Sequence, residues 1–163
     1  MLWFALGLLL CTGCSHYQLG TGAQPGFATL YVEPVENRTV LPQARALLTT
    51  QLREAFERDG RVGLANSSET AEATLQVVIR DYHRDVASVQ EQDTGLARKF
   101  TLTLGVSCTL RTRDGKVLFQ DRKVQVQRDA FTDGGQLGAE YMTLPLLAQA
   151  MAQRVSHTVL DVW

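Results

Sequence analysis

The sequence predicts an α+β domain, a two-layer sandwich in which about four to five mostly antiparallel strands pack against two helices on one face of the sheet. Apolar residues recur at helical spacing in two stretches, one after Pro42 and one before the C-terminus, and each stretch predicts a helix. Apolar residues alternate with small or polar ones from Phe100 to Leu110, which predicts a strand of the sheet. Helices with one apolar stripe and strands with one apolar face bury both surfaces when the helices cover one side of the sheet. The predicted order is β-α-β-β-β-β-α.

The first half of the predicted domain contains a helix between two short strands. The strands are expected at residues 29–32 and 61–64. Pro42 suits the first turn of a helix, and Gly60 suits its end. The apolar stripe of this helix consists of Ala44, Leu48, Leu52, Ala55 and Phe56.

Three longer strands follow, at about residues 74–80, 98–111 and 117–126, each supported by alternation. Asp114 and Gly115 form a two-residue hairpin turn between the last two strands. The alternation slips between residues 120 and 123, which predicts a bulge or a sheet edge there. The threonine- and serine-rich face of the central strand is either solvated or a docking surface.

The last helix is expected from about Thr143 to Leu160, after a loop over residues 131–138 that contains three glycines. Thr143 is a candidate N-cap, and Pro145 is tolerated in a first turn. The apolar stripe of this helix consists of Leu144, Leu147, Ala148, Met151, Val155 and Val159.

The N-terminus has the features of an export signal. Residues 2–10 form an apolar run, which is too short to cross a bilayer as a helix because a span needs about 20 apolar residues. Small residues then precede Cys14, which is typical of a bacterial lipoprotein signal and predicts a signal peptide at 1–13 with a covalent lipid on Cys14. An ordinary signal peptide and a buried N-terminal strand are the alternatives. Glycines and a proline predict a tether at 14–27, so the folded domain spans 28–163.

Composition and motifs exclude several classes of function. The formal net charge is −1, so no global charge favours nucleic acid. His16, His83 and His157 lie far apart, without cysteine or carboxylate at ligand spacing, so no metal site, no catalytic residue and no cofactor other than the lipid are predicted. Cys108 lies within the apolar alternation and is expected to be a small buried hydrophobic residue without a disulfide partner.

Basic residues form the one candidate binding site. Pairing of the three long strands is expected to gather Arg84, Arg98, Lys99 and Arg128 at one end of the sheet. Such a cluster can bind phosphate or sulfate through charge-assisted hydrogen bonds. The alternative is solvated charge that discourages aggregation of the sheet edge.

Two stretches carry a resemblance to a known family. Residues 32–39 read Val-Glu-Pro-Val-Glu-Asn-Arg-Thr, and this stretch is similar to the Val-x-Pro-Phe-Glu-Asn-Arg-Thr segment of the lipopolysaccharide-assembly lipoprotein family LptE. Residues 14–20 resemble the Cys-Gly-Tyr-x-Leu start of the same family. Residues 85–89 and 114–118 also fall where the family has similar segments. The Glu-Asn-Arg-Thr segment has a structural alternative, a hydrogen-bonded turn that begins the first helix.

The resemblance implies a function without catalysis. Family members are lipoproteins anchored in the outer membrane that face the periplasm, plug the β-barrel protein LptD and help it assemble. They are also thought to bind lipopolysaccharide through basic residues near a strand-connecting loop. In this chain residues 90–93 are acidic rather than basic, which leaves Arg98 and Lys99 as the nearest substitutes. A periplasmic lipoprotein subunit of another envelope or secretion complex is the alternative function.

Overall fold

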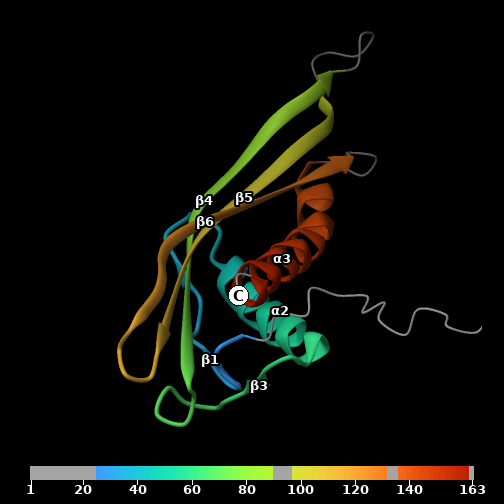
Figure 1. Cartoon of the computed structure of the whole chain (residues 1–163). Coiled ribbons are helices and arrows are strands. Elements are labelled where there is room, and N and C mark those ends of the chain that lie inside the picture. Colours follow the sequence, from blue (N-terminus) through green and yellow to red (C-terminus); the bar gives the residue numbers. More distant parts are fainter. Residues whose placement is uncertain (1–24, 90–96, 132–135, 162–163) are drawn as a thin grey trace, which may run out of the picture.

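The computed structural model describes residues 25–89, 97–131 and 136–161, and within these it contains one sheet and two helices (Figure 1). In chain order the elements are β1 (Thr29–Val32), β2 (Glu36–Asn37), α2 (Gln43–Asp59), β3 (Gly63–Leu64), β4 (Ala73–Val89), β5 (Ala97–Thr112), β6 (Val117–Phe131) and α3 (Gln136–Leu160). Both helices lie on one side of the sheet (Figure 1). The predicted α+β class and its two layers are therefore confirmed.

The sheet joins a short parallel part to a long antiparallel part. Its strand order is β3-β1-β4-β5-β6, and β2 pairs with β4. The three short strands pair in parallel, because α2 forms the crossover that parallel neighbours require. Strands β4, β5 and β6 pair antiparallel and are much longer, so β4 and β5 reach beyond α3 (Figure 1).

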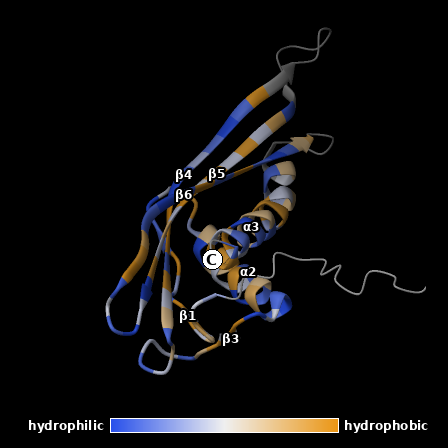
Figure 2. Ribbon diagram, viewed as in Figure 1, coloured by the Kyte–Doolittle hydropathy of each residue, from blue (hydrophilic) through white to orange (hydrophobic). Residues whose placement is uncertain are grey.

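One face of β5 forms the centre of the hydrophobic core. Along the strands, hydrophobic and hydrophilic residues alternate (Figure 2). The side chains of β5 that face the helices are all buried, namely Phe100, Leu102, Leu104, Val106, Cys108 and Leu110. The predicted apolar stripes of both helices are also buried against this face. The alternation at period two and the stripes at helical period therefore predict the core correctly.

Register shifts interrupt the regular pairing on both sides of β5, and two of them lie near the middle of the sheet. In β4 the register shifts between Ile79 and Asp81. In β6 it shifts opposite Cys108 and Leu110, where Asp121 adopts a positive φ of 48°. This second bulge confirms the slip predicted between residues 120 and 123. Since β6 also ends the strand order, both predicted explanations of the slip hold.

The outer face of the sheet is polar. Arg80 Nε donates to Ser107 Oγ at 3.0 Å, and the backbone N–H of Asp121 donates to Thr109 Oγ1 at 3.2 Å. A side chain at Gly105 would place its Cβ only 3.1 Å from the Cβ of Asp81, so this position requires glycine or a shift of β4. Long side chains from β4 and β6 thus cover the small residues of β5.

The start of the last helix differs from the prediction. Helix α3 begins at Gln136, and Thr143 lies inside it, where its hydroxyl donates to the Ala139 carbonyl at 2.8 Å. The sequence predicts Pro145 in the first turn, because proline lacks the N–H that an interior position needs. The helix instead continues through Pro145, and Glu140 in its first turns bonds Tyr82 and Arg84 of β4.

Arg61 connects the C-terminal ends of the two helices. Its guanidinium lies 2.7 Å from Asp59 Oδ1 and 2.8 Å from Asp161 Oδ1. It also donates to the Leu160 carbonyl at 3.3 Å, where a cation offsets the negative end of the helix dipole. The hydrogen bond from Arg61 lowers the pKa of Asp59. Burial would raise the pKa of Asp161, but hydrogen bonds from Arg61 and His157 lower it overall.

We expect Arg61→Ala to lower the free energy of unfolding by about 1 kcal/mol at pH 7, because the ion pairs are partly exposed. The carboxyl pKa values are lower in the folded state, so this stabilisation is present above their ordinary value of about 4 and is lost as pH falls through the lowered values. Denaturant unfolding at several pH values measures the difference. Arg58→Ala, at an exposed position of α2, is the control. A pH-independent difference would contradict the expectation.

Cys108 is free, buried and surrounded by the core. Burial raises the pKa of its thiol to about 12, so the thiol stays protonated and unreactive at neutral pH. Cys108→Ser is expected to cost about 1–3 kcal/mol of stability, because it buries a hydroxyl among apolar side chains. Cys108→Ala is the matched control in thermal or denaturant unfolding. Equal losses for the two variants would assign the effect to lost volume rather than to the hydroxyl.

Candidate functional site

The strand register brings the predicted basic residues to one end of the sheet. Arg84 in β4 and Arg128 in β6 both pair with Leu102 of β5. Lys99 lies three residues further along β5. The residues divide between the two faces of the sheet, however. Arg84 and Arg128 pair with Leu102, whose side chain faces the core, so they lie on the helix side. Lys99 lies an odd number of residues from Leu102 along β5 and therefore faces the other side. Sequence spacing predicted the common end of the sheet but not this division.

Arg84 is held by the first turns of α3. Its Nη1 lies 2.9 Å from Glu140 Oε2, and its guanidinium lies 5.3 Å from the centre of the Phe100 ring. The Tyr82 hydroxyl donates to the other oxygen of Glu140. Burial, together with the Glu140 carboxylate, raises the pKa of Tyr82, so this hydroxyl remains a donor. This network attaches the start of α3 to β4. It also offsets much of the positive charge of Arg84, because Glu140 forms an ion pair with it.

Lys99 forms a separate polar group with β6. Its Nζ lies 2.8 Å from Asp129 Oδ2 and 5.9 Å from the centre of the Phe131 ring. Thr101 donates to the other oxygen of Asp129 at 3.0 Å. The hydrogen bond from Lys99 lowers the pKa of Asp129, so the pair stays charged at neutral pH. The backbone of Arg98 belongs to β5, and its side chain lies outside the described part of the structure.

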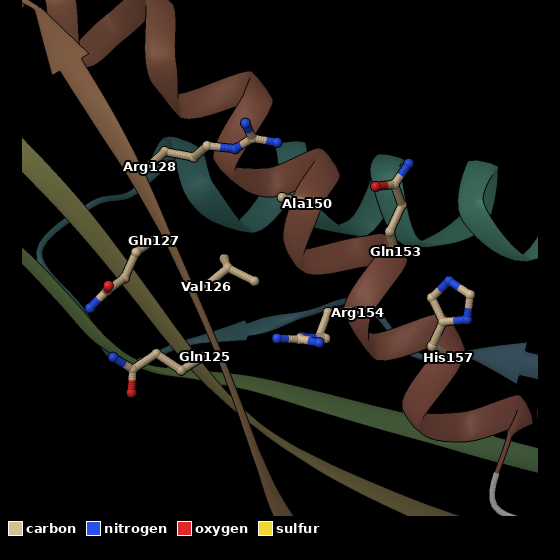
Figure 3. A pocket seen from close by; sticks show the side chains of 8 residues that line it. All are labelled: Gln125, Val126, Gln127, Arg128, Ala150, Gln153, Arg154 and His157. Carbon is tan, nitrogen blue, oxygen red and sulfur yellow. The ribbon is translucent and has the colours of Figure 1, made fainter.

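Arg128 lies in a groove between β6 and α3 (Figure 3). The groove has a volume of about 630 Å³. Its lining consists of Gln125, Val126, Gln127, Arg128, Ala150, Gln153, Arg154 and His157. Among the residues described, no carboxylate lines it. Arg128 and Arg154 have no ion-pair partner there, whereas the His157 ring bonds Asp161 at 2.9 Å.

The sequence did not identify the α3 side of this groove. Ala150, Gln153, Arg154 and His157 follow the spacing i, i+3, i+4 and i+7, so they share one helix face. That spacing was available in the sequence, but it does not reveal which strand edge lies beside the face.

An exposed apolar surface covers the first half of α3. Tyr141 and Met142 are 76% and 77% exposed, and Leu146 is 54% exposed. Between residues 136 and 153 the helix carries one charged residue, Glu140, which is bound to Arg84. This face therefore offers uncharged side chains to the surroundings. Such contiguous apolar patches mark interaction sites more often than single exposed apolar residues do.

The Glu-Asn-Arg-Thr segment forms a braced turn. The Asn37 side-chain oxygen accepts bonds from the backbone N–H and the hydroxyl of Thr39, at 2.9 and 2.8 Å. Its amide nitrogen donates to the Leu41 carbonyl at 2.8 Å. Arg38 pairs with Glu36 at 2.9 Å at the exposed surface. These bonds favour the structural interpretation, in which the segment shapes the entry into α2.

Within residues 25–89, 97–131 and 136–161 no group of three His, Cys, Asp or Glu side chains is placed to hold a metal ion. Over the same residues, no helix has the length and apolar character needed to cross a membrane. His83 and His157 both lie at the surface, as predicted. Cys14 and nearly all of the predicted tether lie outside the described residues.

The fold is shared with solved bacterial lipoproteins. The chain is similar to an uncharacterised lipoprotein B from Nitrosomonas europaea, with 19% identity, a TM-score of 0.56, and coverage of 89% of this chain and 88% of that one. Rare lipoprotein B from Shewanella oneidensis has 17% identity and a TM-score of 0.50, with coverage of 80% and 89%. PelC from Paraburkholderia phytofirmans, a dodecamer, has 16% identity and a TM-score of 0.53, with coverage of 82% and 89%.

Sequence comparison identifies the family. No curated protein matches the chain. The family model for LptE, described as lipopolysaccharide-assembly, matches residues 27–159, which is nearly the whole folded domain. The resemblance predicted from residues 32–39 is thereby confirmed, and the chain belongs to the LptE lipopolysaccharide-assembly family.

Proposed function

We propose that this protein is a lipoprotein of the outer membrane that plugs an LptD-like β-barrel and helps it assemble for lipopolysaccharide transport. The family match over residues 27–159 carries this proposal. The protein acts by binding and not by catalysis, which agrees with the family. A covalent lipid on Cys14 anchors it at the periplasmic face of the outer membrane, and residues 14–27 link that anchor to the domain.

The barrel partner is supported by the apolar face of α3. Tyr141, Met142 and Leu146 expose large apolar surfaces that a partner would cover. The first turns of α3 are held rigidly by the Tyr82–Glu140–Arg84 network, so the face is presented in one orientation. Preorganisation of this kind reduces the entropy lost on binding.

The lipopolysaccharide site is proposed at the end of the sheet that carries Arg84, Arg98, Lys99 and Arg128. Lipopolysaccharide carries phosphate groups, and guanidinium groups bind phosphate with strong, directional hydrogen bonds. Arg128 has no ion-pair partner among the described residues, so no described carboxylate competes with an anion for it. Arg84 and Lys99 already form ion pairs with Glu140 and Asp129, so part of their positive charge is offset before an anion binds.

Membrane pull-down tests the barrel proposal. The lipidated wild-type chain, extracted in mild detergent, is expected to recover a large β-barrel protein, and mass spectrometry of the bait is expected to find an acylated Cys14 at its N-terminus. A variant with Met142→Glu and Leu146→Glu should lose the barrel, because charges would be buried in the interface. Val40→Glu, at a residue 93% exposed elsewhere, is the control.

Recovery of the chain alone, with wild type and variant behaving identically, would contradict the barrel proposal. A stable ring or other oligomer of the unacylated domain would instead favour the alternative, a lipoprotein subunit of another envelope or secretion complex. The dodecameric state of the structurally similar PelC makes size measurement of the unacylated domain the appropriate second experiment.

Substitution of Lys99→Ala together with Arg128→Ala is expected to weaken binding of purified lipopolysaccharide about tenfold at low salt, because each change removes a charge-assisted contact. The difference should shrink as salt screens the charges. Arg45→Ala, which removes an exposed arginine of α2, serves as the control in the same assay. Unchanged affinity in the double variant would show that these basic residues are solvated surface charge and do not bind lipopolysaccharide.

A further inference from the structure

The outer edge of β6 is an unprotected strand edge over much of its length. β6 ends the strand order of the sheet. From Arg122 to Phe131 it pairs with β5 without a register shift, whereas the bulge at Asp121 distorts its other half. Bulges, short lengths, charged side chains and covering helices are the means by which proteins protect an edge from pairing with another chain. Only one half of β6 is protected by a bulge.

The groove runs along the backbone of the unprotected half. Its strand side is lined by four consecutive residues, 125–128. Consecutive residues of a strand point to opposite faces, so a groove that touches all four must follow the strand edge. Its helix side is one face of α3 from Ala150 to His157, a length of about 10 Å. That length accommodates about three residues of an extended chain.

The side chains of the groove favour a negatively charged occupant. Arg128 and Arg154 approach it from the strand and from the helix (Figure 3). Neither arginine has an ion-pair partner within the described part of the chain. Gln153 adds an amide group that can donate or accept, whereas the Gln125 and Gln127 side chains point away from α3 (Figure 3). No described lining residue is acidic.

We propose that this groove binds an extended, acidic segment of a partner protein, which adds to the sheet as a strand beside β6 and places carboxylates near Arg128 and Arg154. An edge strand with a helix alongside is the arrangement in which several peptide-binding domains add a strand. The backbone edge presents carbonyl oxygens as well as N–H groups. An extended peptide satisfies both kinds of group, whereas a phosphate would be repelled by the carbonyl oxygens.

This inference does not depend on lipopolysaccharide binding. The lipopolysaccharide test changes Lys99 and Arg128, whereas Arg154 belongs only to the groove. Either proposal can therefore fail while the other stands.

The test uses the mature chain and a short blocked peptide that alternates glutamate with valine. Isothermal titration should show binding at low salt, and a peptide that alternates lysine with valine should not bind. Arg154→Glu is expected to weaken binding at least about tenfold, as loss of one charged contact predicts. Arg154→Gln, a milder change, should show a smaller loss, and Arg45→Glu should behave as wild type.

Hydrogen exchange separates strand addition from simple charge contact. The glutamate peptide should slow exchange of backbone amides within residues 124–131, because new inter-strand hydrogen bonds protect them. Binding without this protection, equal binding of the lysine peptide, or unchanged affinity of both Arg154 variants would overturn the proposal. Protection of the same amides by inorganic phosphate alone would overturn it as well.

Discussion

The apolar face of β5 is the constraint on which the rest of the molecule depends. Six alternating side chains from Phe100 to Leu110 are buried, and both helices pack on the side to which they point. Burial of apolar side chains is the main favourable term in folding, at about 25 cal/mol per Å². A shift of one residue in the pairing of β5 would turn this whole set to solvent. The register of the three long strands is therefore strongly specified.

That register also determines where the polar chemistry lies. β4 and β5 extend beyond the helices (Figure 1). Fewer core side chains pack against these far ends, which carry charged residues. Arg84 is bound by Glu140 on the helix side, and Lys99 is bound by Asp129 of β6. Arg80 lies at the β4 register shift and reaches across the outer face to Ser107, whereas the β6 bulge lies opposite Thr109. The apolar face in the first half of α3, which is suited to a protein partner, is thus distinct from the charged end of the sheet.

The family assignment and the geometry support one consistent description. The chain belongs to the LptE family, and its described residues offer candidate binding surfaces. Three such surfaces can be distinguished: the apolar face of α3, the basic end of the sheet, and the groove beside β6, the last two sharing Arg128. Met142, Lys99 and Arg154 each belong to one surface only, so a barrel, an anionic lipid and an extended peptide can each be tested with different substitutions.

The sequence alone determined the fold class, the core stripes, a hairpin about Asp114–Gly115, the β6 bulge and the family, because each depends on local periodicity or on a contiguous motif. The hairpin loop is longer than the predicted two residues, since β5 ends at Thr112 and β6 begins at Val117, and of the two turn residues only Gly115 has a positive φ. It also determined that Arg84 and Arg128 share one end of the sheet, since antiparallel pairing about two turns leaves little freedom. The start of α3 was decided by tertiary contacts, because Glu140 binds groups on β4 that lie far away in sequence. Likewise, only the tertiary structure placed Arg154 beside the edge of β6, since helix spacing defines a face but not its neighbour.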